Sequence, residues 1–167
     1  VAVRPLPISI RRLMDRKNLI ESAYNIFGVF EKPIRCAIHD DDCLECRDHE
    51  KTLKKATRET LSTDDVGTVA WSPIPNMNPE AMSYFLPRLI ELAVTKAIDP
   101  DGDPYMMQFI NTVLDGPDCE RFCLLDEEHK NMILQALLYL RAHYYMIVKD
   151  ECWDQELDMA IEKWRSS

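Results

Sequence analysis

DEEHKNMILQALLYLRAHYYMIV, residues 126–148, is the strongest helical pattern in the sequence. Its apolar side chains recur at spacings of 4, 3, 4 and 3, and Leu134 and Leu138 widen the apolar face; the recurring positions are Ile133, Leu137, Leu140, Tyr144 and Ile147. Three to four apolar residues per two turns give a helix one face to bury against a core. The stretch therefore predicts a long central helix over 126–148.

The flanking sequence predicts further helices in the same chain. We expect them over 16–27, over 43–61, from Pro79 with Asn78 as N-cap, from about 104 with Asp103 as N-cap, and over 150–164. Pro87 predicts a kink or two stacked segments in the helix that Pro79 begins. Only four glycines occur among 167 residues, and no two are close. Their scarcity excludes a Gly-rich phosphate loop and disfavours a hairpin-rich β fold.

These patterns together predict an all-α fold, a single-domain bundle of about six helices over 16–167. A basic, Pro-containing arm over 1–15 precedes it. The formal net charge is −9, and it is uneven: residues 1–35 carry seven Lys and Arg against three Asp and Glu. An acidic body repels phosphate backbones, so no nucleic acid partner is expected. No membrane span or secretory signal is evident, and we expect a cytoplasmic protein whose thiols are mostly reduced.

One cluster of cysteines and histidines suggests chemistry: Cys36-x2-His39-x3-Cys43-x2-Cys46-x2-His49. Thiolate and imidazole are the ligands that zinc prefers, and Cys-x2-Cys spacing lets two sulfurs reach one ion. The candidate zinc ligands are Cys43, Cys46 and His49, with either His39 or Cys36 as the fourth. Asp40, Asp41 and Asp42 precede the expected helix and are its candidate N-caps. A structural site would normally take its second ligand pair from a distant knuckle, which here means Cys119, Cys123 or Cys152.

Two other interpretations of this cluster stay open. Cys43 and Cys46 are also spaced as a dithiol redox pair at a helix start, although the adjacent aspartates oppose a low thiol pKa. Alternatively, the cysteines pack as small apolar side chains and the histidines are solvated. No other set of residues has a recognisable catalytic pattern. We therefore expect first a non-enzymatic module that binds a protein partner with a basic surface, then a zinc-binding module, then a thiol oxidoreductase.

Three stretches resemble a family of small bacterial proteins catalogued as a domain of unknown function. They are Leu19-Ile-Glu-Ser-Ala-Tyr to Pro33, the Cys43-x2-Cys46 segment in a charged helix, and Pro79-Glu-Ala-Met-Ser-Tyr-Phe-Leu-Pro87. The resemblance covers about residues 18–150 and leaves the arm outside. It implies a small, mostly helical bacterial protein and implies no activity.

Overall fold

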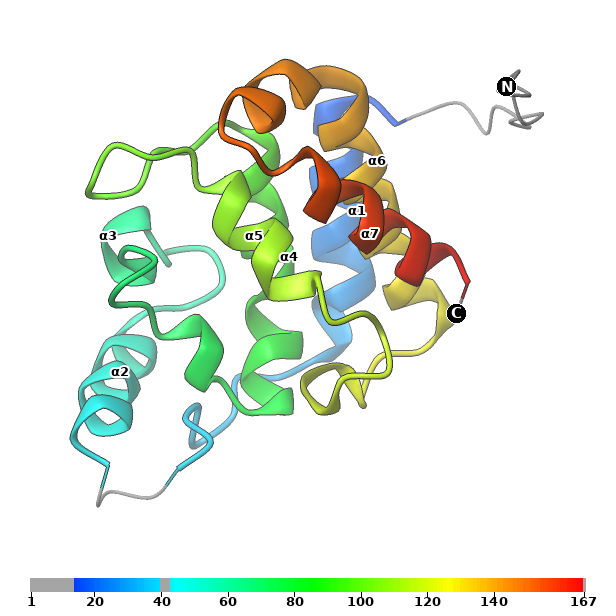
Figure 1. The fold of residues 1–167 in the computed structure, drawn as a ribbon. Helices are drawn as coiled ribbons and strands as arrows, with labels where there is room; N and C mark the ends of the chain where they lie inside the picture. The colour runs from blue at the N-terminus through cyan, green and yellow to red at the C-terminus, as the bar shows by residue number, and fades with distance from the viewer. Residues whose placement is uncertain (1–13, 40–42, 167) are drawn as a thin grey trace, which may run out of the picture.

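The computed structural model describes residues 14–39 and 43–166, and helices account for their regular structure (Figure 1). The α-helices are α1 (Arg16–Ile26), α2 (Leu44–Lys55), α3 (Thr63–Val66), α4 (Pro79–Val94), α5 (Met106–Val113), α6 (Glu127–Asp150) and α7 (Asp154–Arg165). Three 3-10 turns join them: η1 (Phe27–Val29), η2 (Ile74–Asn76) and η3 (Glu120–Phe122). Within the described residues, β pairing is limited to isolated bridges. The predicted all-α fold is confirmed.

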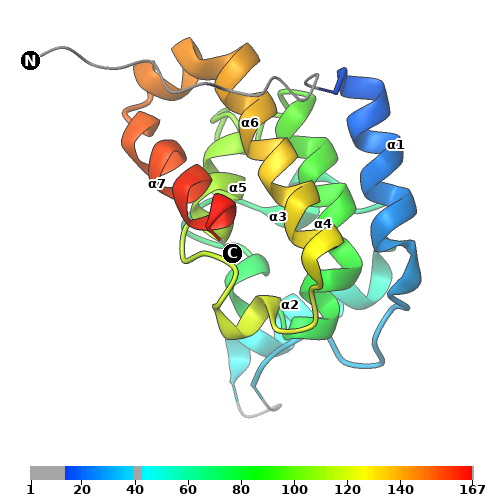
Figure 2. The ribbon, with the colours of Figure 1, turned by 90° about the vertical axis from the view of Figure 1, so that its right-hand side faces the viewer.

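The core lies where α1, α4 and α6 meet, and Figure 2 shows these three helices side by side. α6 is the long helix that the apolar repeat predicts, and Leu137 and Leu140 on that repeat are fully buried. α7 packs against α6 and α5, and the Trp164 indole N–H donates to the Val113 carbonyl at 2.7 Å. Burial of these apolar side chains stabilises helices that are individually too short to persist in water.

α4 is buried around most of its surface, because it contacts α1, α5 and α6 as well as two of the 3-10 turns. Its start follows the prediction: the Asn78 side chain accepts from the Ala81 N–H at 2.8 Å, and Pro79 occupies the first turn. The alternative of two stacked segments is wrong, since α4 runs uninterrupted through Pro87. The apolar neighbours on all sides hold the helix together across the missing proline N–H.

The second expected helix is shorter than predicted. α2 ends at Lys55, and Ala56 turns the chain into an extended conformation. Arg58 explains the break, because its buried guanidinium donates to the carbonyls of Phe27 and Phe30 and lies 4.0 Å over the Tyr84 ring. These bonds satisfy carbonyls after α1 that a longer α2 would leave unpaired.

The start of α5 also differs from the prediction. Tyr105, and not Asp103, is its N-cap, and no side chain caps it. The aspartate that orders this turn is Asp99, whose Oδ1 accepts from the backbone N–H of Asp101 and of Asp103 at 3.0 Å each. Its Oδ2 accepts from the Gln108 side chain at 3.0 Å, which fixes the turn to α5.

The expected arm over 1–15 lies outside the described residues except for Met14 and Asp15. Asp15 is the N-cap of α1, and its side chain accepts from the Asn18 N–H at 3.0 Å. In the described part of the chain, none of the helices combines the length and the apolar character needed to cross a membrane.

Candidate metal centre

His39, Cys43 and Cys46 form the one group of ligand atoms within the described residues that is arranged to hold a metal ion. The histidine nitrogen and the two sulfurs all lie within 4.8 Å of one another, and His39 Nδ1 is 3.3 Å from Cys46 Sγ. Ligands bound tetrahedrally to zinc at about 2.0–2.3 Å stand roughly 3.3–3.8 Å apart. The three side chains therefore offer the donor types that zinc prefers, and the His39–Cys46 separation lies within this range.

The beginning of α2 positions the two sulfurs. Cys43 is the N-cap, with φ −85° and ψ 110°, so its side chain folds back over the first helical turn. Its Sγ accepts from the Cys46 N–H at 3.4 Å. The predicted capping residues Asp40, Asp41 and Asp42 lie outside the described residues, and a sulfur takes the capping role. The extended backbone conformation of Cys43 thus brings its Sγ toward Cys46.

A short extended segment carries His39 to the sulfurs, and α2 holds that segment in place. The Oε2 atom of buried Glu50 accepts from the backbone N–H of Cys36 at 2.8 Å and of Ala37 at 2.7 Å. Lys54 Nζ lies 3.3 Å from Glu50 Oε1. Buried N–H groups rarely lack partners, so a carboxylate that serves two of them fixes the backbone firmly.

The other side of this segment pairs with the chain that leads into α4. The Ile38 N–H donates to the Asn76 carbonyl and the Asn78 N–H to the Cys36 carbonyl, both at 2.8 Å. The Arg35 guanidinium donates to the His39 carbonyl. Residues 35–39 are therefore hydrogen-bonded to α2 on one side and to the segment 76–78 on the other, an arrangement we call the clamp. His39 is the last residue of this segment.

The electrostatic surroundings of the two thiols differ. Hydrogen bonds from the Cys46 backbone N–H and then from its side chain lower the pKa of Cys43 below its ordinary value. Burial, followed by the hydrogen bond to Cys43, raises the pKa of Cys46. Thiolates are the metal-binding form of cysteine, so the lowered pKa of Cys43 favours that form more than the raised pKa of Cys46 does.

His49 and Cys36, which the sequence also offered as ligands, are not members of the group. The His49 ring is buried against Trp71, with 4.7 Å between ring centroids, and its Nε2 lies 3.4 Å from Glu45 Oε1. Trp71 is itself 53% exposed and lies against this histidine on the solvent side. The Cys36 thiol is buried, and burial raises its pKa to about 11.

All six cysteines lie in the described part of the chain, and each is a free thiol. Cys119 is half-buried, whereas Cys123 and Cys152 are exposed. None of these three belongs to a metal-binding group within the described residues, so they supply no second ligand pair. The group offers three protein ligand atoms, and an ion bound tetrahedrally by all three would keep one further position for water or another ligand.

Sequence reasoning missed the residues that support the ligands, above all Glu50 and Asn78. A signal for Glu50 exists: it follows Cys46 by four residues, so these two residues are neighbours on one side of α2. The bonds of Asn76 and Asn78 to the His39 segment have no counterpart in local spacing, because they join residues about forty positions apart.

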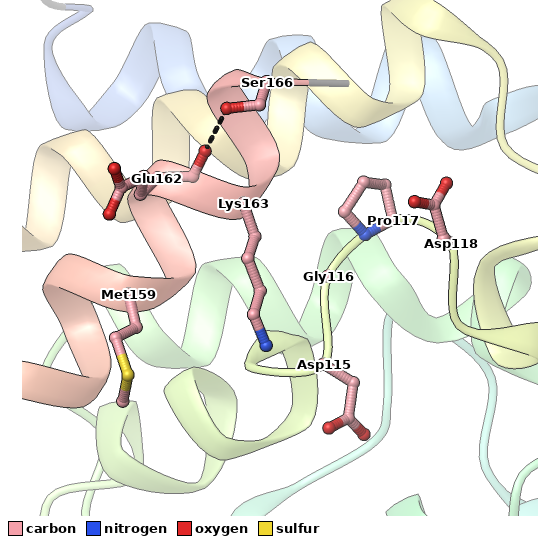
Figure 3. A pocket seen from close by; sticks show the side chains of 8 residues that line it. All are labelled: Asp115, Gly116, Pro117, Asp118, Met159, Glu162, Lys163 and Ser166. Atoms are coloured by element: carbon pink, nitrogen blue, oxygen red, sulfur yellow. Dashed lines mark hydrogen bonds between the residues drawn. The ribbon is translucent and has the colours of Figure 1, made fainter.

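A cavity in another part of the molecule has a different character. It measures about 490 Å³ and lies between α7 and the loop 115–118 (Figure 3). Figure 3 shows the carboxylates of Asp115, Asp118 and Glu162 spread around it and not turned toward one another. Lys163 Nζ is already bonded to the Leu114 carbonyl at 2.9 Å. The cavity therefore lacks a converging set of polar groups for a ligand.

A scan against models of known protein families, a search of curated proteins and a search of solved structures each gave no match. The resemblance to a bacterial domain of unknown function stays a prediction.

Proposed function

We propose that this protein is a zinc-binding helical module in which His39, Cys43 and Cys46 hold the ion at the N-terminus of α2. The observation that carries the proposal is the meeting of three zinc-type ligand atoms within 4.8 Å. A hydrogen-bonded clamp supports them from outside the ligand set, as partners of metal ligands commonly do. Zinc bound here joins the segment 35–39 to the first turn of α2.

The structural consequence of binding is stabilisation of the native state. An ion that binds only the folded protein stabilises it by about 2.7 kcal/mol when its concentration is one hundred times Kd. Binding would also draw the exposed His39 and the half-buried Cys43 toward buried Cys46. The expected protein partner with a basic surface stays a prediction. A side chain of that partner bound at the fourth zinc position would combine zinc binding with partner binding.

The experiment is a zinc titration of reduced, metal-free protein in competition with a chromophoric chelator. The protein carries no histidine tag. We expect one zinc per chain, and a weakening of the affinity by at least about tenfold in each of His39→Ala, Cys43→Ser and Cys46→Ser. Cobalt in place of zinc reports sulfur ligation through a thiolate-to-metal absorption band that the two serine variants weaken.

Cys123→Ser is the matched control, because this thiol is exposed and lies outside the ligand group. It should bind zinc as the wild-type protein does. Unchanged affinity in all three ligand variants, or an equal loss in Cys123→Ser, would contradict the proposal. Far-UV circular dichroism of each metal-free variant shows whether a loss of affinity comes from a loss of folding.

A further inference from the structure

The two sulfurs of the metal centre are placed for a reaction with each other. Cys43 Sγ and Cys46 Sγ lie within 4.8 Å. Because Cys43 is the N-cap and is not helical, its sulfur stands over the first turn, 3.4 Å from the Cys46 nitrogen. A disulfide needs Cβ atoms about 3.8 Å apart, closer than residues three apart within a regular helix. Cys43 lies outside the regular helix, in an extended conformation, and is not held to that helical spacing.

The two thiols differ in how solvent can reach them. Cys46 is 1% exposed, whereas Cys43 is half-buried. A molecule from solution can therefore attack, or be attacked by, Cys43 only, while Cys46 can react only with a sulfur already beside it. This asymmetry assigns the two steps of an exchange reaction to two different residues.

We propose that Cys43 and Cys46 are also a dithiol–disulfide pair that reduces small-molecule disulfides. The Cys43 thiolate attacks one sulfur of the disulfide, forms a mixed disulfide and releases the first thiolate. The Cys46 thiolate then attacks Cys43 Sγ, forms the Cys43–Cys46 bond and releases the second thiolate. Two electrons pass from the protein to the small disulfide, and the two protons of the cysteine thiols end on the two released thiols.

This reaction and the proposed zinc site use the same sulfurs, so they exclude each other. A disulfide removes two of the three zinc ligands, and bound zinc holds both sulfurs away from exchange. The dithiol reaction itself does not depend on zinc or on His39, which allows the two proposals to fail separately.

The test equilibrates the metal-free, reduced chain with glutathione buffers of graded ratio between the thiol and its disulfide. Samples are quenched with acid, alkylated and mapped by mass spectrometry. We expect one protein disulfide, between Cys43 and Cys46, in wild type and in His39→Ala. Cys46→Ser should stop at a mixed disulfide between Cys43 and glutathione, and Cys43→Ser should form neither product. Cys123→Ser, the control, should behave as wild type.

Several results would overturn the proposal. One is a pair that stays reduced in the native chain under buffers that oxidise the same chain in denaturant. Another is a mixed disulfide on Cys46 in Cys43→Ser, which would show that Cys46 is reachable from solution. Prior addition of zinc should suppress oxidation of wild type. If oxidation proceeds unchanged with zinc present, the dithiol proposal stands and the zinc site is the one refuted.

Discussion

Replacing Glu50 with alanine tests whether the clamp on residues 35–39 builds the metal centre. Glu50 touches no ligand atom, yet its Oε2 accepts the N–H groups of Cys36 and Ala37 at 2.8 and 2.7 Å. Alanine leaves both donors without a partner beside α2. The segment that carries His39 then loses its attachment to the helix that carries the two sulfurs.

The magnitude follows from these bonds. A hydrogen bond to a charged group contributes about 1.5–3 kcal/mol, so the loss of two such bonds predicts a decrease of about 3–6 kcal/mol in the free energy of unfolding. The ion pair with Lys54 adds little, because the lysine side chain is more than half exposed. Zinc affinity should fall by about 10–100-fold, the usual effect of removing a group that orients a metal ligand.

Urea unfolding, monitored by far-UV circular dichroism, measures the free energy of unfolding. Zinc affinity is measured without urea, in competition with a chelator, under conditions where the variant is folded. Glu50→Gln is the matched control, since its amide oxygen still accepts hydrogen bonds but carries no charge. We expect it to lose about 1–2 kcal/mol and less zinc affinity than the alanine variant. Surface substitutions usually change the free energy of unfolding by no more than about 0.5 kcal/mol. A change that small in Glu50→Ala would refute this reasoning.

Three further predictions concern residues near the centre. His49→Gln should keep wild-type zinc affinity, because the His49 ring faces Trp71 and Glu45; a loss comparable to that of Cys46→Ser would place it among the ligands. The raised pKa of Cys36, about 11 against an ordinary 9.0, stabilises the fold below pH 9, and this contribution is lost as the pH rises through 11. Wild type should therefore lose more stability than Cys36→Ala between pH 9 and 11 in chemical unfolding, and parallel profiles would contradict this. Gly67→Ala should lose more than about 1 kcal/mol, because Gly67 has φ +72° and a Cβ would collide with the Trp71 carbonyl; a thermal melt like that of wild type would disprove it.

The fold was predictable where apolar periodicity is strong. α6 follows the repeat over 126–148 because one continuous apolar face is enough to fix a helix and its buried side. The end of α2 was not predictable in this way. The charged stretch through Leu61 contains no glycine or proline that would mark an end. The break comes from Arg58, whose side chain reaches carbonyls about thirty residues earlier.

The group of possible metal ligands was predictable in part for a similar reason. Cysteine and histidine spacing identified His39, Cys43 and Cys46, which are close in sequence. His49 was expected as a neighbour because it is three residues beyond Cys46. At about 100° per residue, however, His49 stands about 60° to one side of Cys46 and Glu50 about 40° to the other side, so the two side chains meet different neighbours. Glu50, which completes the clamp, is therefore the residue directly after His49, which the spacing had selected as a ligand.

The zinc content of tag-free protein, measured together with alkylation of Cys43, tests the central claim most directly. After incubation with zinc and removal of free metal, we predict one zinc per chain and a Cys43 thiol that reacts with an alkylating reagent only once a chelator is added. A metal-free chain whose Cys43 reacts equally fast with and without chelator would contradict a metal centre at His39, Cys43 and Cys46.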